Sequence, residues 1–137
     1  MRKLSEIVEN QEPLTLPPST SVQQACRHMR DRRVGAVMVA DDERLVGIFT
    51  GRDAVHRVLA AGKSPAKTTL SEVMTPDPYT MPPERLAIEA LRHMADARFR
   101  HMPVVEGDRI FGIVSRSDFS GLELDRFDEE TGLWERI

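Results

Sequence analysis

Apolar residues recur along this chain at two spacings, one typical of helices and one typical of strands. The helical spacing i, i+3, i+4, i+7 occurs twice and predicts two helices, each with one buried face. The residues on these faces are Val22, Ala25, Cys26 and Met29 in the first helix, and Ala87, Ala90, Leu91 and Met94 in the second. Short apolar runs around a polar turn follow each helix and predict the strand pairs 34–40 with 45–50 and 102–106 with 110–115.

Each predicted helix follows a short apolar β segment, at 14–16 and 79–81, and a Pro-Pro pair. We expect the helices to begin at Ser19 or Thr20 and at Glu84, and a second helix to begin near Arg52 and near Ser117. The order β-α-β-β-α therefore occurs twice. It predicts an α+β fold of two pseudo-symmetric repeats that pack through their sheets into one module.

The two halves of the chain are also alike residue by residue. Positions 13–54 align without gaps with 78–119 at an offset of 65, and 15 of the 42 pairs are identical. The segment LSEIV at 4–8 matches LSEVM at 70–74. A repeat of about 60 residues buries too little surface alone, so we expect the copies to share a core. The predicted divisions are a first repeat at 4–61, a linker at 62–69, a second repeat at 70–120 and an acidic extension at 121–137.

One seven-residue motif stands at the predicted strand-to-helix junction of each repeat, GIFTGRD at 47–53 and GIVSRSD at 112–118. Glycine allows a close approach to the backbone, and a hydroxyl stands three residues before the acid. Asp is also favoured in the first turn of a helix for capping alone, which is the structural alternative. Because capping requires neither the glycine nor the hydroxyl, the repeated motif favours a site for a ribose diol and a phosphate.

The paired motifs, the segment RFRHMPVV at 98–105 and the repeat period resemble a tandem pair of CBS (cystathionine-β-synthase) domains, also called a Bateman module. The resemblance covers about residues 4 to 120. It implies a module with two clefts for adenosine compounds such as AMP, ADP, ATP, NAD or S-adenosylmethionine, and a homodimer. In such modules the motif Asp holds the ribose hydroxyls, and the Ser or Thr lies near ribose and phosphate.

Carried over to this chain, the resemblance implies two sets of ligand-binding residues. The first set is Asp118, Ser115, Arg116 and His101, with Thr15, Thr20, Val34 and Gly35 from the other repeat as walls. The second set is Asp53, Thr50 and Arg52, with Thr80, Phe99 and Arg100 from the other repeat. The first repeat has Ala36 where the second has His101, so the clefts are expected to differ and two clefts need not mean two ligands.

Composition excludes several function classes. The longest apolar runs are shorter than the ~20 residues that span a bilayer, and the N-terminus lacks a signal-peptide core, so we expect a cytoplasmic protein without a membrane partner. Residues 121–137 have a net charge of −4 and the rest of the chain +1. The sequence has no basic stripe of the kind that binds nucleic acids, so we expect no nucleic-acid partner. Cys26 is the only cysteine, and we expect it to be a small buried hydrophobe.

Catalytic and metal sites are not indicated. The chain lacks the GxSxG, HExxH and P-loop motifs, and neither motif Asp has a partner acid at a recognisable spacing. We therefore expect no enzyme activity, no required cofactor and no metal. His28 and His93 could form a metal site only if the repeats brought them together, and solvated or capping histidines are favoured.

Two functions are retained for comparison. The favoured one is a regulatory adenine-nucleotide sensor of energy or redox state, which signals by conformational change to a separate, unidentified effector protein. The alternative is a ligand-independent dimeric adaptor with vestigial clefts. Large apolar residues in the extension favour its docking across the dimer with Trp134 buried, against the alternative of a frayed terminus. These residues are Leu122, Leu124, Phe127, Leu133, Trp134 and Ile137.

Overall fold

The computed structural model describes residues 1–97, 99–119, 121 and 123–127. The chain forms two compact units, which we describe separately. The first-repeat unit comprises Glu12–Tyr79 with the turn Gly107–Ile110. The second-repeat unit comprises Met1–Gln11, Thr80–Glu106 and the described residues from Phe111 onward.

The first-repeat unit contains a four-stranded sheet in the order β1-β2-β3-β4. Strand β1 pairs with β2 in parallel, and the other neighbours are antiparallel. The strands are β1 (Thr15–Leu16), β2 (Ala36–Asp41), β3 (Arg44–Thr50) and β4 (Thr75–Pro76). The helices are α2 (Val22–Arg32), α3 (Gly51–Asp53), which continues as the π-helix η1 (Ala54–Leu59), and α4 (Leu70–Val73).

The second-repeat unit is built on a two-stranded sheet of β5 (His101–Glu106) and β6 (Arg109–Ser115). Helix α5 (Ala87–Ala97) precedes this hairpin, and a short 3-10 helix η2 (Arg116–Asp118) follows it. Helix α1 (Leu4–Val8) belongs to this unit. Residues 123–127 are also helical.

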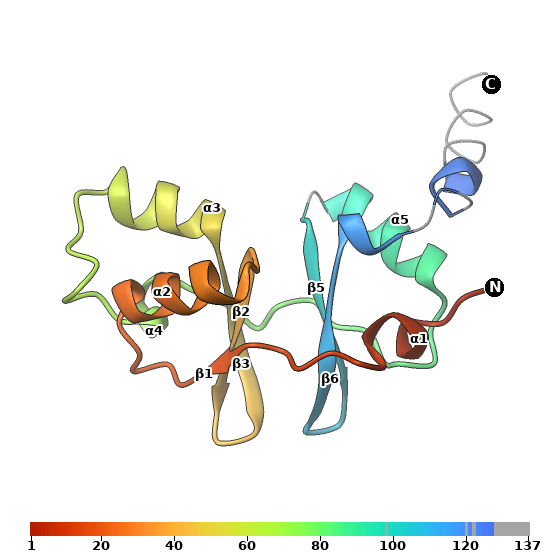
Figure 1. The fold of residues 1–137 in the computed structure, drawn as a ribbon, viewed down its shortest axis with the longest axis horizontal. Helices are drawn as coiled ribbons and strands as arrows, with labels where there is room; N and C mark the ends of the chain where they lie inside the picture. Colours follow the sequence, from red (N-terminus) through yellow and green to blue (C-terminus); the bar gives the residue numbers. More distant parts are fainter. Residues whose placement is uncertain (98, 120, 122, 128–137) are drawn as a thin grey trace. The chain divides into compact units, whose positions relative to one another are not determined.

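The short helix that begins each repeat packs on the body of the other repeat. The Leu4 N–H donates to the Arg85 carbonyl at 2.9 Å, and the Leu70 N–H donates to the Thr20 carbonyl at 2.9 Å. Figure 1 shows α1 beside α5 and α4 beside α2. The compact units therefore exchange their leading helices, and they divide the chain differently from the sequence repeats.

The two sheets differ in strand number, and the sequence explains part of the difference. In the first-repeat unit the Met38 N–H donates to the Leu14 carbonyl at 2.9 Å, next to β1. The corresponding residue of the second repeat is Pro103, which has no N–H to donate. There the segment predicted at 79–81 forms only an isolated parallel bridge between Met81 and Val104.

The other edge differs as well. Strand β4 pairs with β3 through Gly47 and Ile48 in the first-repeat unit. In the second-repeat unit the Gln11 side chain takes this role, because its Nε2 donates to the Ile113 carbonyl at 2.8 Å and its Oε1 accepts from the Ile113 N–H at 2.9 Å. One amide side chain thus replaces a two-residue strand.

Each unit has its own hydrophobic core. One is lined by Leu14, Val22, Ala25, Met29, Val37, Val39, Phe49, Val58, Leu70 and Val73. The other is lined by Leu4, Val8, Met81, Ala87, Ile88, Ala90, Leu91, Met94, Met102, Val104, Val114 and Phe119. The predicted helix faces are confirmed by these clusters, with Cys26 partly buried. Burial raises the pKa of the Cys26 thiol, as expected for a packing residue.

The α+β class is confirmed, while several predicted boundaries were wrong. Helix α2 begins at Val22, because the Ser21 side chain accepts from the Gln24 N–H and caps it. Helix α5 begins at Ala87 rather than near Glu84. The second helix of the second repeat does not run on from Ser117, since η2 ends at Asp118 and Phe119 is extended.

Candidate functional site

The two motif carboxylates close the same hydrogen-bonded turn. Asp53 Oδ2 accepts from the Thr50 N–H at 3.0 Å and lies 3.2 Å from the Thr50 hydroxyl. Asp118 Oδ2 accepts from the Ser115 N–H at 2.7 Å and lies 3.2 Å from the Ser115 hydroxyl. Each Asp therefore does have the structural role of a capping residue. That role engages one carboxylate oxygen, Oδ2, in each Asp.

The motif glycines are required by packing against the leading segments. A Cβ atom on Gly47 would lie 2.4 Å from the Met74 sulfur, and one on Gly112 would lie 2.8 Å from the Val8 Cβ. The close approach predicted at these glycines is therefore real. The group that approaches is the protein's own chain, so the glycines are not independent evidence for a ligand.

The first residue of one strand faces the hydroxyl residue at the end of the next. In the first repeat Ala36 pairs with Thr50, and the Gly51 N–H donates to the Gly35 carbonyl. In the second repeat the Arg116 N–H donates to the Arg100 carbonyl at 3.1 Å. This bond places Arg100 and the start of β5 beside the Ser115 motif. Arg100 and His101 at this sheet end align with Gly35 and Ala36 of the first repeat, which carry no basic side chain.

His101 is half-buried at this end of β5. Burial lowers the pKa of its imidazole, the Asp118 carboxylate opposes this shift by raising it, and the Arg100 guanidinium lowers it. The three side chains thus share one electrostatic environment. An anionic group bound here would favour imidazolium and raise the His101 pKa again.

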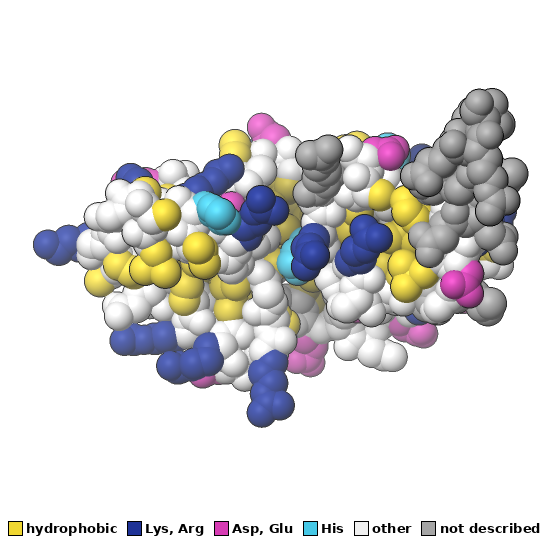
Figure 2. All heavy atoms as spheres, turned by 90° about the horizontal axis from the view of Figure 1, so that it is seen from above, with side chains coloured by type: hydrophobic (Ala, Val, Ile, Leu, Met, Phe, Trp, Pro, Cys, Tyr) yellow, Lys and Arg dark blue, Asp and Glu magenta, His cyan; other side chains and the backbone are white. Residues whose placement is uncertain are grey.

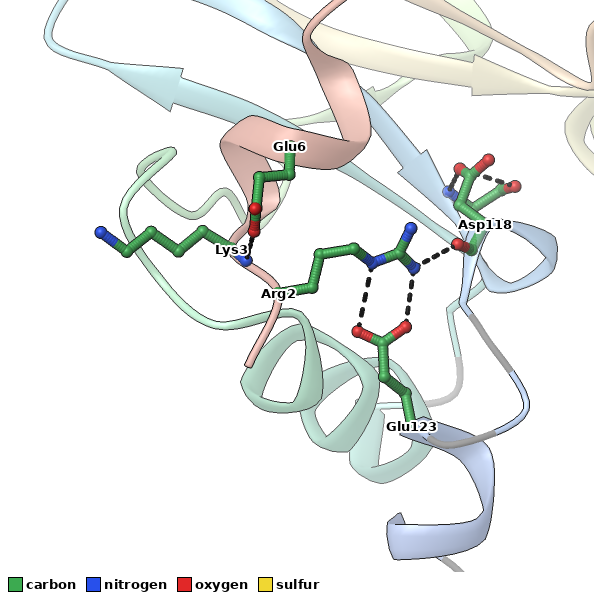
Figure 3. A network of polar contacts seen from close by, with 6 residues as sticks. Arg2, Lys3, Glu6, Asp118 and Glu123 are labelled. Atoms are coloured by element: carbon green, nitrogen blue, oxygen red, sulfur yellow. Dashed lines mark hydrogen bonds and ion pairs between the residues drawn. The ribbon is translucent and has the colours of Figure 1, made fainter.

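The two carboxylates differ in what lies beyond the turn. Asp53 Oδ1 is 3.5 Å from Arg57 Nε, and Arg57 also donates to the Val73 and Met74 carbonyls. For Asp118, the hydrogen bonds from described residues to the side chain all end on Oδ2. Its backbone carbonyl accepts from Arg2 Nη2 at 2.7 Å, and the same Arg2 pairs with Glu123 (Figure 3).

The predicted site residues fall into two groups, one in each unit. Asp118, Ser115, Arg116, His101 and Arg100 gather at one sheet end of the second-repeat unit, and Thr80 and Phe99 belong to the same unit. Asp53, Thr50, Arg52, Thr15, Thr20, Val34 and Gly35 belong to the first-repeat unit. Basic side chains and histidines are visible on the face shown in Figure 2. The pairing of each carboxylate with walls from the other repeat stays a prediction.

Sequence reasoning missed Arg2, Glu123, Gln11 and Arg57. Arg2 and Glu123 are 121 residues apart, and no local spacing signals such a pair. Arg57 stands four residues after Asp53, a spacing that is typical of an ion pair on a helix, and it could have been noticed. Trp134, Leu133, Ile137 and Leu122 lie outside the described residues, so the predicted burial of Trp134 stays a prediction.

Within the described part of the chain, no three His, Cys, Asp or Glu side chains gather closely enough to hold a metal ion. His28 is exposed on α2. Among the residues that the structure describes, no helix is long and apolar enough to cross a bilayer.

Two similar α+β units, each with a strand-end carboxylate held by a hydroxyl residue, define a tandem-repeat module. The sequence pattern of the CBS domain matches residues 4–60 and 70–124. The chain belongs to the CBS-domain family.

Relatives and solved structures agree with this assignment. The chain is 42% identical over 102 residues to the CBS domain-containing protein CBSCBSPB3 of Arabidopsis thaliana, covering 74% of this chain and 18% of that protein. It is similar to the hexameric CBS-CP12 protein from bloom-forming cyanobacteria, with a TM-score of 0.77, 28% identity and coverage of 86% and 69%. The fold also matches CBS domain protein PAE2072 from Pyrobaculum aerophilum complexed with AMP, with a TM-score of 0.82, 20% identity and coverage of 93% and 99%. The chain spans less than a fifth of the length of the first curated relatives.

Proposed function

We propose that this chain is a regulatory module that binds an adenine nucleotide and signals by conformational change to a separate effector protein. CBS-domain proteins are generally regulatory modules that bind adenosine ligands. The proposed role is sensing of energy or redox state, without catalysis. AMP, ADP, ATP, NAD and S-adenosylmethionine are the candidate ligands, and no cofactor or metal is required.

The observation that carries the proposal is the state of Asp118. Its Oδ2 is fixed by Ser115, which orients the carboxylate, while Oδ1 has no hydrogen bond from the described residues. An oriented carboxylate oxygen suits the two hydroxyls of a ribose, because charge-assisted hydrogen bonds are about twice as strong as neutral ones. His101, in the same electrostatic environment, and the exposed Arg116 supply positive charge for a phosphate.

The Asp53 site is proposed as the weaker of the two. Its Oδ1 already faces Arg57, so a ribose has to displace or share that contact. Ala36 stands where the second repeat has His101, which leaves Arg52 and Arg100 for a phosphate. Thr50 orients Asp53 as Ser115 orients Asp118.

The adenine walls are proposed to come from the opposite repeat. For the Asp118 cleft they are Thr15, Thr20, Val34 and Gly35, and for the Asp53 cleft they are Thr80, Phe99 and Arg100. Of these, Val34 is an exposed apolar side chain, which supports a role in covering a ring.

We further propose a homodimer that forms by helix packing. Val55 and Leu59 stand one turn apart and are 52% and 68% exposed. Adjacent exposed apolar residues on a helix are unfavourable in water and suit a partner surface. That a similar CBS protein is hexameric supports self-association in this fold.

A thermal-shift screen with the five candidate ligands tests the proposal. A ligand at 100 times its dissociation constant stabilises the folded state by about 2.7 kcal/mol, which shifts Tm by about 10 °C in a domain of this size. Asp118→Ala should lose the shift, whereas the exposed Lys63→Ala control should keep it. If no adenosine compound shifts Tm, the ligand-independent adaptor is the better account.

A further inference from the structure

Arg2 connects the N-terminal segment of the second-repeat unit to two places more than 110 residues later, the Asp118 turn and Glu123. Its Nη2 donates to the Asp118 carbonyl at 2.7 Å and to Glu123 Oε1 at 2.7 Å, and its Nε donates to Glu123 Oε2 at 3.4 Å. Figure 3 shows the guanidinium between the Asp118 turn and the Glu123 carboxylate. The Glu123 side chain is only 12% exposed. One planar cation therefore joins the N-terminal segment, the proposed ribose site and the helix at 123–127.

The Asp118 carbonyl needs such a donor because the chain leaves helical geometry just after it. Phe119 has φ −84° and ψ 141°, so η2 ends at Asp118. A carbonyl at a helix end has no partner within the helix. In the first repeat the helix continues from α3 into η1 without a break. The first repeat therefore needs no equivalent of Arg2.

The ion pair is also particular to the second repeat. By the repeat offsets, Glu123 corresponds to Val58 and Arg2 corresponds to Thr68. Val58 is 1% exposed and packs in the core of its unit. At Glu123 a carboxylate stands at the position of that buried apolar residue, and it requires a cation nearby.

The helix that Glu123 anchors is seated on the same unit. Leu124 and Phe127 pack against the core cluster that contains Phe119. Phe119 follows Asp118 directly and is 7% exposed. The proposed ribose carboxylate and the 123–127 helix are thus joined by a polar contact through Arg2 and by apolar packing around Phe119.

We infer that Arg2 is a positioning residue that couples the adenosine site at Asp118 to the docking of the 123–127 helix. The inference rests on the proposed function. A ligand that fixes the Asp118 turn also fixes the carbonyl that Arg2 holds, and Arg2 in turn holds Glu123. Coupling of this kind is reciprocal. A change that loosens the docking of the helix therefore lowers the affinity for the ligand, and a bound ligand stabilises the docked helix. The helix surface then reports occupancy to an effector protein.

The ligand arm of the test uses AMP and hydrogen exchange. AMP should slow amide exchange at 123–127 in the wild-type protein. Arg2→Met should abolish that protection and lower the affinity for AMP about threefold to tenfold. Arg2→Lys should recover part of the effect, since a single ammonium cannot reproduce the planar fork. Lys3→Met is the matched control, because the Lys3 side chain points away from Arg2 in Figure 3. Unchanged AMP affinity and retained protection in Arg2→Met would overturn the coupling.

An arm without ligand separates this inference from the proposed function. In the ligand-free protein, Arg2→Met and Glu123→Gln should each speed amide exchange both at 117–119 and at 123–127. An effect confined to one of the two segments would refute the coupling. If wild-type protein binds no adenosine compound while both segments respond together, the proposed function fails and the coupling stands.

Discussion

The first and second strand-to-helix junctions begin alike and continue differently. Thr50 with Asp53, and Ser115 with Asp118, form the same turn on one carboxylate oxygen. After Asp53 the chain continues as a helix that buries Val58. After Asp118 it becomes extended at Phe119, and the later helix carries Glu123 paired with Arg2.

The comparison shows that a local motif fixes a local geometry and that its surroundings decide its chemistry. Arg57 faces the second oxygen of Asp53, whereas Arg2 holds the backbone of Asp118, whose second side-chain oxygen accepts no hydrogen bond from the described residues. Ala36 stands opposite His101 in the repeat alignment. The second-repeat site should therefore bind an adenosine compound more tightly than the first.

The largest expected effect is a difference in binding between the two Asp variants. Asp118→Ala should cost about 2 to 3 kcal/mol of AMP binding, because a carboxylate that bonds two hydroxyls contributes about 1.5 kcal/mol per bond. In a calorimetric titration with AMP, Asp53→Ala should leave the affinity of the tighter site unchanged. Equal losses in both variants would remove the distinction between the sites, and no loss in either would remove the site assignment altogether.

The second effect concerns the paired positions after each turn. Val58→Ala should lower the free energy of unfolding by about 2 kcal/mol, since it leaves a cavity in a core. Glu123→Ala should lower it by about 1 kcal/mol, because Arg2 can still bond to the Asp118 carbonyl and to water. Urea denaturation measures both values. A larger loss for Glu123→Ala than for Val58→Ala would show that the polar contacts of Glu123 stabilise the protein more than the buried Val58 side chain does.

The third effect is the pH dependence of phosphate recognition. Burial lowers the His101 pKa from its ordinary value of 6.5. Folding then disfavours imidazolium, so stability should fall as the pH drops below about 6.5 through the lowered pKa. A bound phosphate raises the His101 pKa again, so binding of AMP takes up a proton. The ratio of AMP affinity to adenosine affinity should therefore rise about fivefold as the pH falls through the same range.

His101→Gln is the control for the phosphate group, whose own second pKa lies near 6 and acts in the opposite direction. The variant should show only that opposing trend, while wild-type protein shows the rise. An identical pH profile of the affinity ratio in both proteins would mean that His101 only packs.

The smallest expected effect comes from Arg57. Arg57→Leu introduces the residue found 65 positions later and frees Asp53 Oδ1. The pair is half-exposed on the arginine side, and such pairs contribute about 0.2 to 1 kcal/mol. The affinity of the weaker site for AMP should therefore rise about two- to fivefold. A loss of affinity at the weaker site instead would show that Arg57 contacts the ligand.

Much of the fold followed from short-range patterns. The buried helix faces and the capping turns depend on residues within seven positions of each other, and the paired residues of β2 and β3 are at most 14 positions apart. The isolated bridge at Met81 could also have been anticipated, since Pro103 removes a donor that Met38 supplies in the first repeat.

The remaining features depend on partners distant in sequence. The five-residue helix at Leu4–Val8 packs on residues near 85, and nothing in its own spacing specifies that choice. Gln11 replaces a strand through its side chain, and Arg2 reaches Glu123 across the length of the chain. Of the candidate site, the carboxylates and hydroxyls were predictable, whereas the contacts that make the two sites unequal were not.

A crystal structure of the protein with AMP would show which carboxylate holds the ribose. We expect the ribose hydroxyls to bond to Asp118 Oδ1, with Oδ2 still held by Ser115 and the phosphate beside His101. AMP bound at Asp53 in preference to Asp118, or bound with its ribose away from both carboxylates, would contradict this expectation.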